Sequence, residues 1–97
     1  MTDSDLPIKL TRVNRRRLLV LLTDAANIGS YDVRRLAGGS SGRVLIFLGR
    51  LEGAGMVTSR REAPEERENH LLPCRRFYRL TPEGRAAAIK ALNLGRR

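Results

Sequence analysis

The pattern of apolar and polar positions predicts two helices in the first part of the chain. From Thr11 to about residue 26, apolar residues recur every three or four positions and can share one face of a helix. The inward residues of this helix are expected to be Val13, Leu18, Leu21 and Leu22. After the breakers in "NIGS", Ser30 suits the N-cap of a short helix over "YDVRRLA". The inward residues of that helix are expected to be Val33, Leu36 and Ala37.

A tight turn and a third helix follow. "GGSSG" has the glycine content of a turn, and Ser40 or Ser41 can cap a helix over residues 41–54 that ends at Gly55. The expected inward residues are Val44, Phe47, Leu48 and Leu51. The opposite face carries Gly42, Arg43, Ile46, Gly49 and Arg50.

β-Branched and aromatic residues then predict a hairpin and a last helix. "MVTSRRE" and "CRRFYRLT" are typical of two strands, joined by the irregular loop "APEERENHLLP". Thr81, Pro82 and Glu83 indicate a helix start, and Gly95 its end. This order predicts an α+β, mainly α fold: a winged helix-turn-helix with three helices, a two-stranded β wing and a C-terminal helix.

Length indicates the number of domains, and charge indicates the class of partner. Ninety-seven residues suffice for one domain, expected over residues 11–95 after a partly disordered arm over residues 1–10. The net charge is +9, and seventeen of the nineteen basic residues are arginine, whose planar fork suits phosphate and guanine edges. A domain this basic favours double-stranded DNA as partner over a merely soluble surface or a membrane surface.

The outer face of the third helix supports DNA binding more specifically. Glycine in a helix costs about 1 kcal/mol relative to alanine, so a face with Gly42 and Gly49 is expected to need small residues. It would let the helix sit deep in a major groove, where flanking arginines reach base edges or phosphates. Leu45 and Ile46 would press on thymine methyl groups. The alternatives are a weak helix without such a role, or a face that admits another helix.

The wing is expected to contact the flanking backbone through its strand arginines, because its loop carries Glu62, Glu65, Glu66 and Glu68. These arginines can equally be solvated edge residues, and Arg15, Arg16 and Arg17 remain open in the same way. The candidate DNA-binding residues are Arg34, Arg35, Ser40, Ser41, Gly42, Arg43, Leu45, Ile46, Gly49, Arg50, Arg60, Arg61, Arg75 and Arg76.

Little in the sequence points to catalysis. His70 and Cys74 are the only residues of their kinds, and a metal site needs three or four ligands, so we expect no enzyme, no metal and no cofactor. Cys74 is expected to be a partly buried apolar filler. No secretory leader or membrane-spanning run is evident, which predicts a cytoplasmic, nucleoid-associated protein. We expect no small-molecule effector.

A homodimer is expected, because one recognition helix reads only a few base pairs. Apolar residues at both ends of the chain are not obviously needed by the core. The candidate interface residues are Leu6, Ile8, Leu10, Ala88, Ile89 and Leu92.

Two segments together resemble a known family. "SSGRVLIFLGRLEGAGMVTSR" and "RRFYRLTPEGRAAAIKAL" are similar to the PadR-type winged-helix transcriptional regulators over roughly residues 12–92, and more distantly to the MarR and ArsR groups. The matching positions are Ser40, Gly42, Val44, Leu48, Leu51, Glu52, Gly55, Met56, Val57, Arg76, Tyr78, Leu80, Thr81 and Gly84. Leu45 and Ile46 stand where the family has Tyr and Pro, and the last helix is much shorter than the dimerisation arm of many members.

The resemblance implies a sequence-specific transcriptional regulator, most simply a repressor, that reads the major groove with helix 41–54 and the backbone with wing 56–80. The alternative is a DNA-binding protein for replication, partition or recombination of a plasmid, phage or chromosome. A third class is a winged helix that binds a protein through the Ile46 face, which the nearby arginines disfavour.

Overall fold

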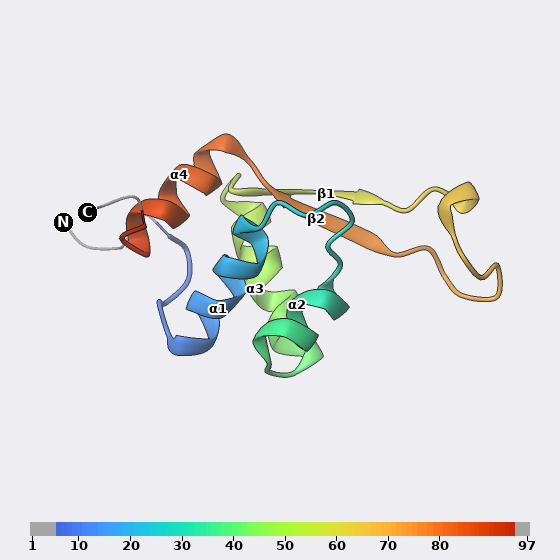
Figure 1. Cartoon of the computed structure of the whole chain (residues 1–97), viewed down its shortest axis with the longest axis horizontal. Coiled ribbons are helices and arrows are strands. Elements are labelled where there is room, and N and C mark those ends of the chain that lie inside the picture. The colour runs from blue at the N-terminus through green and yellow to red at the C-terminus, as the bar shows by residue number, and fades with distance from the viewer. Residues whose placement is uncertain (1–5, 95–97) are drawn as a thin grey trace.

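Three helices, a β-hairpin and a last helix make up the computed structural model, which describes residues 6–94 (Figure 1). The hairpin strands pair antiparallel, from Val57 opposite Leu80 to Arg61 opposite Arg76, and project beyond the helices along the 48 Å long axis of the molecule. This is a winged helix-turn-helix, so the predicted fold class is confirmed. The elements are α1 (Arg12–Leu22), α2 (Ser30–Ala37), α3 (Ser41–Gly53), β1 (Val57–Arg61), a 3₁₀ turn (Pro64–Glu66), β2 (Arg76–Leu80) and α4 (Pro82–Ala91).

The first helix is shorter than predicted. α1 ends at Leu22 rather than near residue 26, and the hydroxyl of Thr23 donates to the carbonyl of Val20 (2.6 Å). Asp24 and Asn27 then adopt φ of 55° and 61°, a left-handed conformation that ends a helix. At this turn the Asp24 carboxylate accepts a hydrogen bond from the guanidinium of Arg79 on β2 (3.0 Å), which ties the turn to the hairpin.

The helix-turn-helix is built by caps and glycines. Gly29, not Ser30, is the N-cap of α2, and its N–H donates to the carboxylate of Asp32 (2.8 Å). Gly38 and Gly39 have φ of 88° and 92°, which glycine adopts at little cost. Ser40 then caps α3 by accepting from the N–H of Arg43 (3.2 Å).

The core lies where α1, α2, α3 and the base of the hairpin meet. It contains Leu18, Leu21, Val33, Val44, Phe47, Leu48, Leu51, Val57 and Leu80. Leu36 was expected to face inward, but it is 57% exposed, because Val33 and Ala37 fill the inward side of the two-turn α2.

Residues from both ends of the chain also belong to this core. Leu6 is 7% exposed and Ala88 is fully buried, so both ends contribute to the core, contrary to the prediction that the core does not need them. Ile8, Leu10 and Leu92 pack against it, partly buried. Residues 1–5 of the predicted arm, and the predicted helix end at Gly95, lie outside the described residues.

The last helix is fastened to the start of the hairpin. The Thr81 hydroxyl accepts from the N–H of Gly84 (2.9 Å) and donates to the carbonyl of Gly55 (2.9 Å). Gly84 is buried, and a side chain there would overlap the backbone of Met56. These contacts explain, by packing, the presence of Thr81 and Gly84 in the segment "RRFYRLTPEGRAAAIKAL".

Candidate nucleic-acid interface

α3 turns one row of residues away from the core. Gly42, Ile46, Gly49 and Gly53 are separated by four, three and four positions, so they lie in one line along the helix, opposite its buried face. A Cβ built on any of the three glycines meets no atom within 4 Å, and Ile46 is 58% exposed. Nothing in the described chain packs on this row, which we call the glycine row.

The two flanks of the glycine row differ in chemistry. On one flank Leu45 is 51% exposed, and farther along it Glu52 accepts from the hydroxyl of Ser59 on β1 (2.7 Å). On the other flank Arg43 and Arg50 are exposed one above the other, seven positions apart. The structure therefore groups the predicted residues of α3 into an apolar centre, a wing side and a cationic side.

A groove runs along the cationic flank of α3, between it and the segment from Ile8 to the second turn of α1. We call it the α1–α3 groove; it measures about 310 Å³. Its basic lining residues are Lys9, Arg17, Arg43 and Arg50, and no acidic residue of the described chain lines it.

Arg17 is the buried member of this cationic set. It is 6% exposed, and its guanidinium carbon lies 5.5 Å from the centre of the Phe47 ring. One terminal nitrogen donates to the side-chain oxygen of Asn14 (2.7 Å), while Nε is buried without a hydrogen-bond partner in the described chain. Burial, and then the charge of Arg43, lower the pKa of Arg17.

Gly39 makes room for Arg17. A Cβ at Gly39 would collide with the terminal nitrogen Nη2, so the guanidinium lies directly against the turn between α2 and α3. The sequence did not decide the role of Arg17. The one sequence signal for its burial is its position beside Leu18 and Leu21, on the otherwise apolar face of the helix.

The wing separates its four candidate arginines onto two faces. Successive strand residues point to opposite faces of a ribbon. Arg61 and Arg76 are paired in register on the face of Ser59, which bonds to α3, and an Arg76 guanidinium nitrogen donates to the Ser59 hydroxyl (3.0 Å). Arg60 and Arg75 belong to the opposite face, where both guanidinium groups lie about 5 Å from the ring of Phe77.

The arginines of that opposite face are bound within the protein. Arg75 forms an ion pair with Glu62 (3.0 Å), whose side chain is 2% exposed, and its guanidinium and N–H lower the pKa of that carboxyl. Arg60 pairs with Glu66 (2.9 Å), and this bond lowers the pKa of Glu66. Two of the four wing carboxylates are thus neutralised locally, which makes the loop less acidic than the sequence indicates.

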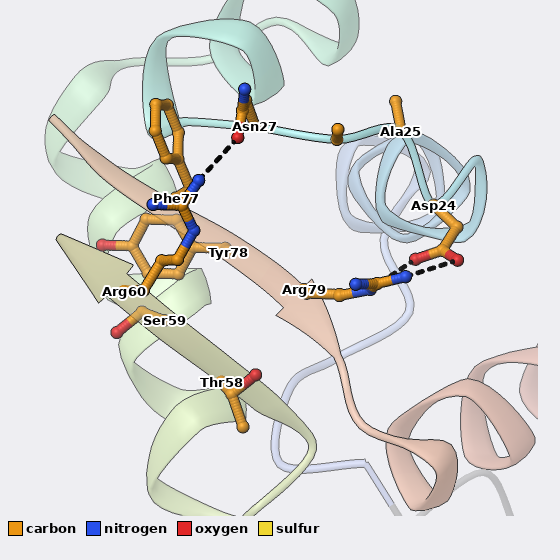
Figure 2. Close-up of a pocket in the computed structure, with 10 residues that line it drawn as sticks. Asp24, Ala25, Asn27, Thr58, Ser59, Arg60, Phe77, Tyr78 and Arg79 are labelled. Atoms are coloured by element: carbon orange, nitrogen blue, oxygen red, sulfur yellow. Dashed lines mark hydrogen bonds and ion pairs between the residues drawn. The ribbon is translucent and has the colours of Figure 1, made fainter. Parts of the chain in front are cut away.

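A second groove, shown in Figure 2, lies between the loop after α1 and the hairpin face that carries Arg60 and Phe77. Its volume is about 310 Å³. Its two cations are both paired: Arg60 donates to the side-chain oxygen of Asn27 (2.9 Å), and Arg79 is bound to Asp24. Asp24 also lies 3.6 Å from Arg85 of α4, and the Arg79 bond lowers the pKa of Asp24. The cations of this groove already form ion pairs within the described chain, unlike those of the α1–α3 groove.

The remaining candidates lie at the helix-turn-helix corner. Ser40 and Ser41 are exposed at the start of α3, and Ser40 is occupied as its N-cap. Arg35 is exposed, with Asp32 at 4.0 Å, while Arg34 is half-buried and lies over the ring of Tyr31. Both arginines remain predictions as DNA contacts.

Three other features concern metal binding, the cysteine and membrane spans. Within residues 6–94, no group of three or more acidic, His or Cys residues is placed to hold a metal ion. Cys74 is partly buried. None of the helices in the described part is long and apolar enough to cross a membrane.

Comparison with known proteins supports the fold. No known family's sequence model matches the chain, and no significant sequence relative was found among characterised proteins. A solved structure of BpsR from Bordetella bronchiseptica, described in connection with the regulation of its DNA binding by 6-hydroxynicotinic acid, is similar with a TM-score of 0.62 and 22% identity. The likeness covers 89% of this chain and 59% of that one, so this chain matches somewhat more than half of BpsR. At that identity, the likeness is one of fold.

Proposed function

We propose that this protein is a sequence-specific, DNA-binding transcriptional regulator that places α3 in the major groove and the wing on the flanking backbone. The observation that carries the proposal is the glycine row. An exposed helix face without side chains, apart from one branched residue, allows the close approach that a groove demands. Arginines on one flank and the wing on the other would then face the two phosphate strands.

The chemistry of the row suggests how bases are read. Ile46 and Leu45 offer only apolar contact, which among base edges suits the 5-methyl group of thymine. The site therefore favours an operator with thymines at the positions beneath α3. Repression is the simplest action for so small a protein, because occupancy of the operator alone can block polymerase. The DNA binding described for BpsR, which shares this fold, agrees with the proposal.

Selection of bound duplexes from a random pool, followed by genomic footprinting, tests this function. A regulator should select one motif and occupy one or a few sites, including sites beside genes. Arrays of repeated sites would instead indicate replication or partition. Affinity should also fall roughly a thousandfold between about 50 and 200 mM salt if six or more phosphates are contacted. A flat salt response in fluorescence anisotropy would contradict DNA as the partner.

A further inference from the structure

We propose that the α1–α3 groove is a binding site for one DNA backbone phosphate. This assignment rests on the proposed function and adds to it which strand contact the cationic flank of α3 makes. The groove contains Lys9, Arg17, Arg43 and Arg50, and the described chain supplies no carboxylate to its lining.

The first argument is the imbalance of charge. Three other arginines described above are each matched by an acid: Arg60 by Glu66, Arg75 by Glu62, and Arg79 by Asp24. Buried charges in proteins are normally paired, because the low dielectric makes an unpaired charge costly. Four cations around one groove, with no counter-charge among residues 6–94 of its lining, fit an anion that comes from outside.

The second argument is the way in which Arg17 is held. Its guanidinium is fixed by Asn14, by the ring of Phe47 and by the close approach of Gly39, so little conformational entropy is lost on binding. Nε lacks an acceptor within the described chain. Arg17 thus supplies a fixed, weakly screened charge beneath the groove, while the exposed Arg43 and Arg50 can donate directly to the phosphate oxygens.

The third argument is position. The cationic flank lies beside the glycine row, on the side opposite the wing. When α3 enters a major groove, the two sugar-phosphate strands run along its two sides. One strand would meet the wing, and the other would meet the α1–α3 groove. Arg43 and Arg50 are therefore assigned to phosphate, and base reading is left to Ile46 and Leu45.

The network at the groove's far edge supports this geometry. The side-chain amide of Asn14 donates to the carbonyl of Lys9 (2.8 Å), and the backbone N–H of Asn14 donates to the Thr11 hydroxyl (3.1 Å). These bonds hold the segment before α1 against the helix, so that Lys9 borders the groove. An anion bound there would contact three parts of the chain at once: this segment, α1 and α3.

The DNA test uses a fluorescein-labelled duplex of mixed sequence, because a phosphate contact does not depend on the operator. Arg43→Gln and Arg50→Gln should each weaken binding about tenfold and reduce the slope of log affinity against log salt by up to ~0.9. Lys90→Gln removes the same charge from α4 and should do neither. If the wild type binds and the two groove variants keep its slope, the phosphate assignment is wrong while DNA binding stands. If the wild type does not bind DNA at all, the proposed function fails.

A second measurement addresses the source of the anion in the DNA-free protein. Inorganic phosphate should shift the Arg17 Nε–H resonance saturably, and the Arg43→Gln/Arg50→Gln double variant should abolish the shift. Both substitutions change exposed side chains, so the double variant is expected to fold, and its amide spectrum tests whether it does. A saturable shift combined with an unchanged DNA salt slope would assign the groove to a free oxyanion and overturn the backbone assignment. No saturable shift would show that the groove is no phosphate site.

Discussion

At the scale of single residues, the glycines of this chain divide into two kinds. Gly39 and Gly84 are required by their surroundings, because a Cβ would collide with Arg17 in one case and with Met56 in the other. Gly42, Gly49 and Gly53 have no such neighbour and ordinary helical backbone. The free energy of folding gains nothing from them, and under the proposed function their value lies in what approaches α3 from outside.

Gly49→Ala tests that value directly. Alanine should stabilise the fold by about 0.5–1 kcal/mol, since it favours a helix and meets no atom within 4 Å. The same methyl group would hold α3 away from the bases, and affinity for the selected operator should fall about tenfold. Chemical denaturation and anisotropy measure the two effects. Ala86→Gly, an exposed change on α4, should lower stability and leave affinity unaltered. A tighter-binding Gly49→Ala protein would contradict close approach.

Gly84→Ala should have the opposite effect on stability. The added Cβ would overlap the Met56 backbone, so α4 must shift from the start of β1 at a cost of roughly 1–3 kcal/mol. Thermal unfolding should show a clear loss of stability. An unchanged melting temperature would mean that the close packing of α4 on Met56 is not present in solution.

At the scale of elements, the wing should behave as a ribbon with a binding face and a structural face. The Arg61→Gln/Arg76→Gln variant should lose phosphate contacts, with a lower salt slope and little change in stability. The Arg60→Gln/Arg75→Gln variant should unfold more readily, because it leaves the buried Glu62 and Phe77 without their partners. Paired measurements of melting temperature and salt slope distinguish the two. Equal effects of both variants would remove the distinction between the faces.

The elements also show what sequence reasoning can reach. α3, the hairpin and the start of α4 were predicted closely, because each is marked by local signals: the Ser40 cap, strand-forming residues and the Thr81–Pro82 start. The end of α1 and the exposure of Leu36 were predicted wrongly. Asp24, just after the end of α1, is bound by Arg79, which lies 55 positions away, and the inward side of α2 is filled by Val33 and Ala37. Such distant or competing contacts leave no local pattern.

The candidate site was predictable to a similar degree. Helical spacing alone placed Gly42, Ile46 and Gly49 on the outer face of α3. It could not separate the two faces of the wing, because that separation depends on the register of the strands and on which arginine meets Glu62. The α1–α3 groove could not be predicted either, since it is formed by the segment before α1, by α1 and by α3, which only the fold brings together.

At the scale of the whole molecule, we expect a homodimer on a pseudo-palindromic site, because one α3 spans few base pairs. Leu6 and Ala88 are used by the chain's own core, so an interface must use the partly exposed apolar residues around them. Leu10, Ile89 and Leu92 remain candidates, together with Leu94, which is 42% exposed beyond the end of α4; Ile8 lines the α1–α3 groove and is assigned there instead. This surface is distant from the wing, which leaves the wing and α3 open to DNA (Figure 1).

Leu94→Asp should therefore shift the dimer toward monomer and weaken operator binding, because a charge in an apolar interface is costly and cooperative binding of two half-sites is lost. Leu71→Asp provides a matched control, since Leu71 is an equally apolar residue in the wing loop and is 92% exposed. Light scattering across micromolar concentrations would measure the mass, and titration of the selected operator would give the stoichiometry. The control should keep the wild-type mass, whatever it does to DNA affinity. A wild-type protein that stays monomeric at high micromolar concentration and binds its operator one to one would exclude the dimer.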